Sequence, residues 1–344
     1  MRATYQTLPV NEWPVADRIA WQDACRPALR LLKGGSACGI KPVSRTAYAR
    51  AYGYLLDFCL RTSRFDPQAA AAGHVTPAIM DAFVAELQTR VGSIARYNYL
   101  SRIERMARLL APGTDTAWLK EVVAELEDQI TPRSKVARIV SSARLLELGL
   151  DLVERAKAST NGTNLQRARL HRDGLMIAML ALCPIRLKNF ASIQIGKQLR
   201  KIDDQWWIML ASEETKTGRA DERPLPTILT PIIDQWIDTY RPAFLRPGDA
   251  LWVSTAGGAV AYTYVGAIIT ETTRRELGIA VNPHLFRDCA VFTVAHNAGR
   301  EMGIASALLQ HTDHRVTDKH YNRGAIVEAV KSFHRIVLAI DETA

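Results

Sequence analysis

Apolar residues recur along most of the chain at the three- and four-residue spacing of helices that bury one face. The spacing predicts two groups of helices, separated by a short polar stretch. The first group comprises helices from about Ser44, from about Pro77, and over residues 93–110 and 118–130. The second comprises helices over residues 141–158 and 165–182, and from Thr230 to the end.

Between residues 199 and 226 the spacing changes to the two-residue alternation of strands. Residues 199–202 and 206–210 are expected to pair as a hairpin around the turn at Asp203 and Asp204, with a third strand near residues 223–225. The predicted fold class is therefore mainly α with a small antiparallel β-sheet. This order of elements excludes a Rossmann or barrel layout.

Breaks in the pattern divide the chain into four segments. Residues 1–40 have mixed patterning, end in a Lys-Gly-Gly-Ser-Ala loop and form an N-terminal extension of unknown role. Residues 41–130 form a helical domain, and residues 131–135 form a linker whose proline stops the preceding helix. Residues 136–344 form a second domain that ends in a C-terminal helix.

Composition narrows the class of protein. The chain has 344 residues, of which 48% are hydrophobic and 23% charged, which excludes a disordered or fibrous protein. No apolar run is long enough to span a membrane, and the first twenty residues lack the apolar core of a secretory signal. The five cysteines are scattered without a C-x-x-C pair, which favours a reducing compartment. We therefore expect a cytoplasmic protein.

Positive charge is concentrated in two stretches. The chain carries 44 Lys and Arg against 35 Asp and Glu, a net charge of +9. Residues 135–200 hold twelve basic against four acidic residues, and residues 41–110 hold ten against five. This distribution favours double-stranded DNA as a partner, because neutralised phosphates release counterions. A solvated basic surface is the alternative.

The expected helix over residues 93–110 carries the candidate DNA contacts of the first domain. Three of them recur every three residues, on the other side from the apolar stripe. The candidates are Arg96, Arg102, Arg105 and Arg108. We predict that they bind phosphates, and the alternative is a solvated face.

Cofactor motifs are missing from the sequence. It contains neither G-x-x-x-x-G-K-[ST] nor G-x-G-x-x-G, the glycine loops that bind nucleotide phosphates. His311 and His314, with His320 nearby, have no cysteine or carboxylate to complete a zinc set. We expect neither a metal nor a nucleotide cofactor.

The second domain does contain an ordered series of cationic and hydrogen-bonding residues. Each one alone has an ordinary structural explanation, and the order is what carries information. The series is Arg186 in Cys-Pro-Ile-Arg, Lys216 in Glu-Thr-Lys-Thr-Gly-Arg, His284 and Arg287 in His-Leu-Phe-Arg, His311 in Leu-Leu-Gln-His, and Tyr321 in Asp-Lys-His-Tyr.

This series resembles the catalytic set of the tyrosine recombinase, or phage integrase, family over about residues 135–335. Residues 41–130 are similar in arrangement to the family's helical core-binding domain, and residues 136–344 to its catalytic domain. Two positions near the first arginine depart from the family pattern. Pro184 stands where a glycine is usual, and Asn189 where an acidic residue is usual. Gln310 also replaces the usual glycine before the second histidine.

The resemblance implies a role for each residue of the series. Tyr321 would attack the scissile phosphate and form a 3′-phosphotyrosine intermediate, since a phenol is both a competent nucleophile and a competent leaving group. Arg186 and Arg287 would clamp the non-bridging oxygens, with His311 as a further donor. His284 would donate or move the tyrosine proton. Lys216 would protonate the leaving 5′ oxygen, and a plain phosphate contact is its alternative.

The resemblance also implies a biological setting. It suggests a site-specific recombinase for integration or excision of a mobile element, or for resolution, acting as a homotetramer on DNA. It places the protein near the nucleoid in the bacterial cytosol, and it allows an accessory DNA-bending or directionality protein. Two other enzymes share the catalytic set, a type IB topoisomerase and a telomere resolvase. A catalytically silent DNA-binding regulator is a third alternative.

The C-terminal helix carries one apolar stripe at helical spacing, made by Ile326, Val330, Phe333, Val337 and Ile340. Such a stripe packs either on its own chain or, as the family resemblance suggests, on a neighbouring protomer. The sequence leaves both open.

Overall fold

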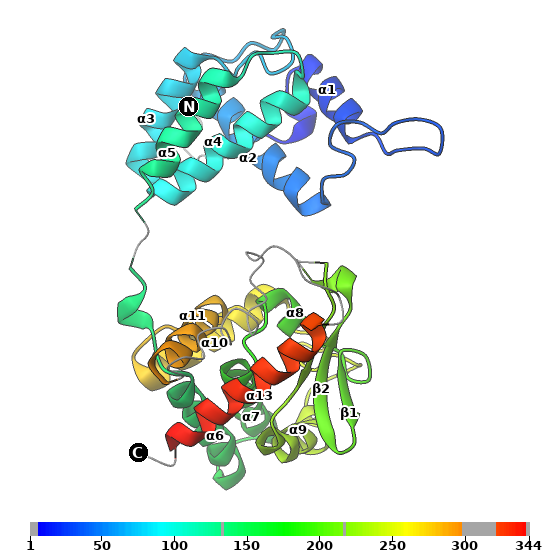
Figure 1. The fold of residues 1–344 in the computed structure, drawn as a ribbon, viewed down its shortest axis with the longest axis vertical. Helices are drawn as coiled ribbons and strands as arrows, with labels where there is room; N and C mark the ends of the chain where they lie inside the picture. Colours follow the sequence, from blue (N-terminus) through cyan, green and yellow to red (C-terminus); the bar gives the residue numbers. More distant parts are fainter. Residues whose placement is uncertain (1–5, 132–133, 216–217, 298–320, 342–344) are drawn as a thin grey trace. The chain divides into compact units, whose positions relative to one another are not determined.

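A computed structural model describes residues 6–131, 134–215, 218–297 and 321–341. The chain divides into two compact units, Met1–Ser134 and Lys135–Ala344, which we call the amino-terminal and carboxy-terminal units. The division falls inside the segment expected as a linker. The fold is mainly helical with one three-stranded antiparallel sheet, as predicted (Figure 1).

The amino-terminal unit is helical. Its elements are a 3-10 turn at Val10–Glu12 and the helices α1 (Val15–Cys25), α2 (Pro42–Arg61), α3 (Pro77–Arg90), α4 (Ser93–Leu110) and α5 (Ala117–Asp128). The four helices predicted from the spacing are confirmed as α2 to α5. Helix α2 begins two residues before Ser44, because a proline with its fixed φ is well suited to the first helical position.

Part of the segment before residue 41 belongs to the core of this unit. Leu8, Trp13 and Trp21 are buried with the apolar residues of α2 to α5. Asp17 of α1 is buried as well: its Oδ2 accepts from the Tyr52 hydroxyl at 2.8 Å and its Oδ1 from the amide of Ala72 at 2.7 Å. These bonds satisfy the carboxyl in the core and fix α1 on the unit.

The carboxy-terminal unit contains the sheet. Its helices are α6 (Ser142–Ala158), α7 (Asn164–Leu182), α8 (Leu187–Ala191), α9 (Thr230–Gln235), α10 (Tyr262–Leu277), α11 (Pro283–Asn297) and α13 (Tyr321–Asp341), with one π-helical turn at Trp236–Tyr240. Short 3-10 turns lie at Val136–Arg138, Ser212–Glu214, Thr227–Leu229 and Arg241–Ala243. None of the described helices is both long and apolar enough to cross a membrane.

Helices α6 and α7 form the centre of this unit's core and touch through their backbones. A Cβ on Gly149 would lie 2.6 Å from the amide nitrogen of Ala178, and one on Gly174 would lie 2.7 Å from the carbonyl oxygen of Gly149. Only glycine allows this approach. The close pairing holds the end of α7, where the first predicted catalytic arginine follows, in a fixed place.

The sheet has the order β1–β2–β3, with β1 at Leu199–Ile202, β2 at Gln205–Leu210 and β3 at Asp221–Pro224. Asp203 and Asp204 join β1 to β2 with φ of 46° and 61°, the left-handed conformation of a type I′ hairpin turn. The predicted hairpin is confirmed. Strand β3 packs against α13.

Helix α13 packs within its own unit. Val330, Phe333 and Val337 of the predicted apolar stripe are fully buried in the core formed by the other helices and the sheet. These three side chains therefore have no surface left for a neighbouring protomer. The side chains of Ile326 and Ile340 lie outside the described ones.

Candidate functional site

Arg186 lies in the turn that follows α7. Pro184 cannot continue that helix because it has no N–H to donate, and the amide of Ile185 closes the turn onto the carbonyl of Cys183 at 2.7 Å. Arg186 is then the N-cap residue of α8, with an extended backbone (φ −67°, ψ 138°) and a half-buried side chain. The end of one helix and the start of the next thus fix the backbone of this arginine.

Helix α11 brings two more residues of the predicted set to the same turn. The side-chain oxygen of Asn282 accepts a backbone N–H three residues later at 3.0 Å and caps the helix. Arg287 is buried, and its Nη1 donates to the carbonyl oxygen of Pro184 at 2.8 Å. His284, one helical turn earlier, is exposed. The structure therefore brings Arg186, His284 and Arg287 together.

The charges of these residues act on one another. Burial lowers the pKa of Arg287 to about 10, and the nearby charges of Arg186 and Arg223 lower it as well, against the opposing field of Asp221. Although the side chain is exposed overall, partial desolvation of its ring lowers the pKa of His284, and the charges of Arg287 and Arg186 lower it as well, against the opposing field of Asp288. At neutral pH Arg287 is therefore still a cation, and His284 is a neutral imidazole with one donor and one acceptor.

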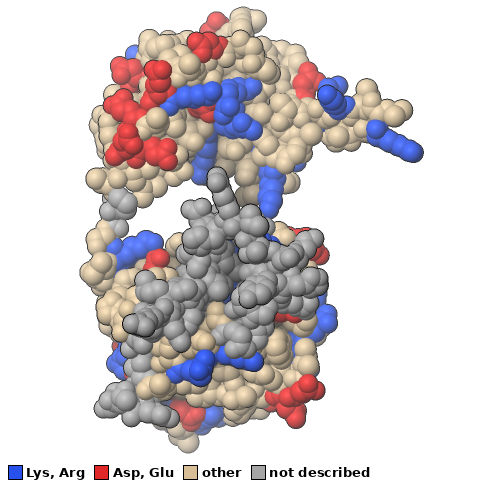
Figure 2. Space-filling view, in the orientation of Figure 1, with Lys and Arg blue, Asp and Glu red and all other residues tan. Residues whose placement is uncertain are grey.

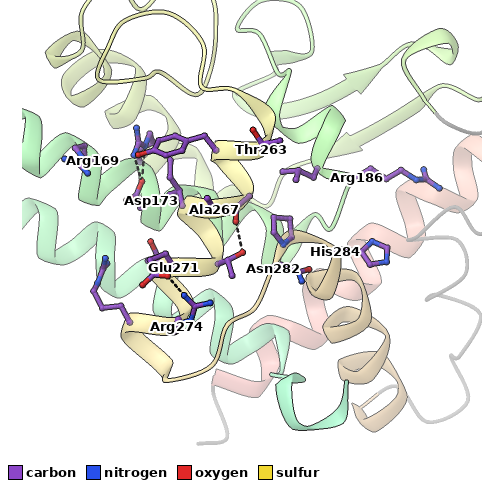
Figure 3. A pocket seen from close by; sticks show the side chains of 18 of the residues that line it. Arg169, Asp173, Arg186, Thr263, Ala267, Glu271, Arg274, Asn282 and His284 are labelled. Carbon is purple, nitrogen blue, oxygen red and sulfur yellow. Dashed lines mark hydrogen bonds and ion pairs between the residues drawn. The ribbon is translucent and has the colours of Figure 1, made fainter. Parts of the chain in front are cut away.

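The three residues line one cavity of about 1290 Å³ that runs along α10. Figure 3 shows Arg186 and His284 at one end of it and Arg169 and Asp173 at the other. Six arginines and two acidic residues belong to the lining. They are Arg169, Arg172, Arg186, Arg274, Arg275 and Arg287, with Asp173 and Glu271. The cavity is therefore strongly cationic.

Both acidic residues of the lining already have partners. Asp173 accepts from Arg172 Nε at 2.9 Å and from its Nη2 at 2.8 Å, and Glu271 pairs with Arg274. Among the described residues no carboxylate pairs with Arg186. The end of the cavity at Arg186 and Arg287 is therefore the part best suited to bind an added anion.

The structure describes no side chain for the other three predicted catalytic residues. Lys216 and His311 lie outside the described residues, and Tyr321 is the first residue of α13, with its side chain not described. Among the described residues nearby, the Thr215 hydroxyl donates to the carbonyl of Arg219 at 2.7 Å and accepts from its amide at 3.0 Å. The roles of all three stay predictions.

Helix α13 is also tied to the turn before Arg186. His334 is buried, and its Nε2 lies 3.1 Å from the carbonyl oxygen of Leu182, the last residue of α7. Because a carbonyl only accepts, Nε2 carries the hydrogen. The carbonyls of Leu182 and Pro184 thus receive donors from the helix that begins at Tyr321 and from the helix of Arg287.

The sequence reasoning missed a buried ion pair beside this site. Arg223 of β3 is 1% exposed and donates to Asp221 through Nε at 2.6 Å and through Nη2 at 2.9 Å. The two residues stand two apart on one strand, so their side chains share a face. That spacing of opposite charges within a short strand was the available signal.

The four arginines predicted to contact DNA do not form one surface. Arg105 and Arg108 line a second cavity of about 460 Å³ together with Lys120, whereas Arg96 and Arg102 do not. Arg108 also pairs with Glu104 at 2.6 Å. At 100° per residue Arg96 and Arg105, nine residues apart, point to opposite sides of the helix. DNA contact by all four stays a prediction.

The described residues contain no group of three or more side chains that could hold a metal ion. The histidines considered for zinc, His311, His314 and His320, lie outside the described part of the chain.

Comparisons with known proteins bear on the fold. No family model matches the chain, and no curated protein matches it. A pre-cleavage complex of XerH site-specific recombinase bound to difH substrate is similar to it, with 14% identity, a TM-score of 0.50, and coverage of 82% of this chain and 76% of that one. A post-cleavage complex of XerH with palindromic difH gives 14% identity, a TM-score of 0.51, and coverage of 87% and 79%.

XerA recombinase is similar at 13% identity, with a TM-score of 0.37 and coverage of 87% of this chain and 94% of that one. At 14% sequence identity, the similarity to the XerH structures is a similarity of fold. Over most of its length the chain has the fold of a tyrosine recombinase, and the resemblance expected from its sequence is confirmed at that level.

Proposed function

We propose that this chain is a site-specific tyrosine recombinase that cuts and rejoins DNA strands through a 3′-phosphotyrosine intermediate. One observation carries the proposal: Arg186 and Arg287 converge, with His284, at one end of a cavity whose described lining holds six arginines and two acidic residues, both of which pair with other arginines. A scissile phosphate with its two non-bridging oxygens is the anion that such a pair of guanidinium groups fits.

The arginines would act on charge. Attack on a phosphodiester increases the negative charge on the non-bridging oxygens in the transition state. Preformed donors aimed at those oxygens stabilise it, each by about 3–4 kcal/mol. The contact from Arg287 to Pro184 holds one donor before substrate binds, so little reorganisation is needed.

The remaining residues would move the proton and the bond. The Tyr321 oxygen forms a bond to phosphorus, the bond from phosphorus to the 5′ oxygen breaks, and the 5′ oxygen takes a proton from Lys216. His284 is neutral and so can accept the tyrosine proton, and His311 would donate to a non-bridging oxygen. One phosphate ester replaces another, so the reverse step rejoins the strand without ATP.

Duplex DNA with a specific recombination site is the proposed substrate. The solved XerH complexes contain difH DNA, and the basic residues of both units suit a duplex partner. We infer assembly as a homotetramer on that DNA in the cytosol, for integration, excision or resolution, with an accessory DNA-bending protein where the site requires one. Arg96, Arg102, Arg105 and Arg108 are the proposed phosphate contacts of the amino-terminal unit.

The test is covalent capture. In a duplex nicked just beyond the cleavage position, attack releases the short fragment that carries the free 5′ hydroxyl. Because that fragment diffuses away, the strand cannot be rejoined, and the covalent adduct accumulates and survives SDS. Wild-type protein should form the adduct, whereas Arg287→Ala should bind the same duplex and form it at least about a hundred-fold more slowly. Arg274→Ala, which removes an arginine already paired with Glu271, is the matched control and should behave as wild type.

A wild-type protein that binds DNA and yields no adduct would support the silent regulator, and relaxation of supercoils without any preferred site would support the topoisomerase.

A further inference from the structure

A loop between α1 and α2 projects from the amino-terminal unit. We call residues 26–35 the hook (Figure 1). Its base is closed by hydrogen bonds from the amide of Gly35 to the carbonyl of Arg26 at 2.9 Å and from the amide of Ala37 to the carbonyl of Ala24 at 2.8 Å. A Cβ on Gly35 would lie 2.0 Å from a backbone oxygen, so only glycine closes this base. The hook is therefore a built element of the fold.

The tip of the hook presents leucines to solvent. Leu29 and Leu32 exchange two backbone hydrogen bonds, at 3.0 and 3.1 Å, which fixes the turn between them. Leu29 is 63% exposed, Leu31 93% and Leu32 64%. Several large aliphatic side chains exposed on one short projection mark a binding surface, because a partner that covers them gains the burial they lack.

The hook is also cationic. Arg26, Arg30 and Lys33 alternate with the leucines and are exposed, and Figure 2 shows basic side chains on the projecting loop. Residues 24–56 hold six basic residues and no acidic one. A partner must therefore carry negative charge close to an apolar surface.

The hook adjoins the proposed phosphate contacts of the same unit. Ser36, which follows its base, lines the cavity of about 460 Å³ with Arg105, Arg108 and Lys120. A DNA backbone bound over this cavity would therefore run past the base of the hook. The minor groove of duplex DNA has phosphates along both sides and exposes the base steps between them. Leucine side chains are known to insert between such base steps as wedges.

Building on the proposed function, we propose that the hook enters the minor groove of duplex DNA beside the recombination site, with its cations on the phosphates and its leucines against the base steps. The competing partner is a second copy of this chain. The exposed carboxylates of α5, at Glu121, Glu125 and Asp128, are the surface of such a copy that would attract the cations of the hook. The experiment must separate the two.

Two variants separate the contribution of the hook's charge from that of its leucines, and a third variant serves as control. Arg30→Gln with Lys33→Gln removes charge, and Leu29→Ser, Leu31→Ser and Leu32→Ser together remove the wedge. Leu245→Ser is the control, because Leu245 is a comparably exposed leucine of the carboxy-terminal unit. The probe is a short duplex of mixed sequence that contains 2-aminopurine, whose fluorescence rises when its base is unstacked. Affinity is measured by anisotropy over a range of salt, and mass without DNA by light scattering.

The charge variant should lower the dependence of log K on log salt by roughly two units, one for each lost contact. The leucine variant should keep the wild-type slope, bind roughly ten-fold more weakly, and lose the 2-aminopurine signal. Leu245→Ser should match wild type. Wild-type affinity and fluorescence in the leucine variant would overturn the proposal. The proposal would also be overturned if the leucine variant lost self-association in the absence of DNA but kept the fluorescence signal. That result would assign the hook to contact with a second copy of the chain.

Adduct formation on the nicked duplex keeps this result apart from the proposed function. A wild-type protein that unstacks the probe and never forms an adduct contradicts the recombinase and supports the hook. A wild-type protein that forms the adduct, with hook variants identical to it in affinity and fluorescence, contradicts the hook alone.

Discussion

Arg287 Nη1 donates to the carbonyl oxygen of Pro184 at 2.8 Å, two residues before Arg186. The acceptor is a backbone oxygen, so proline supplies it as well as the glycine usual at this position would. Proline at this position is therefore compatible with the contact between the two arginine segments. Asn189 is buried and uncharged, and the fields of Asp221 of β3 and of Asp288 oppose the lowering of the Arg287 pKa.

We expect an oxyanion to stabilise the carboxy-terminal unit by binding between Arg186 and Arg287. The two guanidinium groups repel each other, and a tetrahedral dianion offsets both charges. Sulfate at a hundred times its dissociation constant should add about 2.7 kcal/mol to the free energy of unfolding. The measurement is the thermal midpoint with sodium sulfate against sodium chloride at equal ionic strength, which controls for screening.

Arg186→Ala should abolish the rise in midpoint, and Arg274→Ala should retain it, because that arginine already pairs with Glu271. An equal rise in all three proteins would mean that sulfate acts through general exclusion from the surface.

The sequence predicted the elements whose signals are local. Helix α4 follows from its apolar spacing, α7 from that spacing and the proline after it, and the hairpin from two aspartates suited to a type I′ turn. Helix α1 was not predicted, because Asp17 is buried and Val15 and Ile19 are exposed, which reverses the usual amphipathic pattern. Only the tertiary contacts from Tyr52 and Ala72 make that burial favourable.

The candidate site was predictable in its residues and not in its geometry. The order Arg186, His284, Arg287 is visible in the chain, but their meeting depends on α11 packing against α7, a contact between segments about a hundred residues apart. The pair Asp221 and Arg223 escaped because charges in a short strand are normally read as solvent-facing, whereas here both face inward.

Loss of the Asp221 carboxylate should be costly. Asp221→Asn leaves the guanidinium of Arg223 buried without its counter-ion, which should lower the free energy of unfolding by about 3–5 kcal/mol. The double variant Asp221→Asn with Arg223→Met buries no charge and should recover most of that loss. Urea unfolding followed by tryptophan fluorescence measures both. Equal losses in the single and double variants would show that the pair contributes through packing alone.

Two buried histidines should make the carboxy-terminal unit sensitive to acid. Burial, together with the nearby charge of Arg223, lowers the pKa of His334 to about 4, and burial lowers that of His171 to about 4 as well. The unfolded chain then binds more protons than the folded one between about pH 6.5 and pH 4. Stability should therefore be full above about pH 6.5 and fall by roughly 1.4 kcal/mol per pH unit for each histidine as the pH drops towards 4.

His334→Gln keeps an N–H donor for the carbonyl of Leu182 and removes the titrating group. It should reduce the slope of unfolding free energy against pH by the contribution of one proton, with the contribution of His171 remaining. A slope identical to wild type would mean that the His334 ring is already charged in the folded protein.

The nucleophile and the acid should separate on two substrates. Tyr321→Phe removes only the hydroxyl, so DNA binding should persist and the covalent adduct should disappear. Lys216→Ala should also bind but form the adduct about 10²–10⁴-fold more slowly, because the 5′ oxygen leaves without a proton.

Replacing that bridging oxygen with sulfur gives a leaving group that needs no proton. The Lys216→Ala protein should therefore recover on the sulfur substrate, while Tyr321→Phe stays inactive and Arg287→Ala stays slow on both, because its charge acts on the non-bridging oxygens. A Lys216→Ala protein that sulfur does not rescue would transfer the acid role to His284, and a residual adduct in Tyr321→Phe would exclude that tyrosine as the nucleophile.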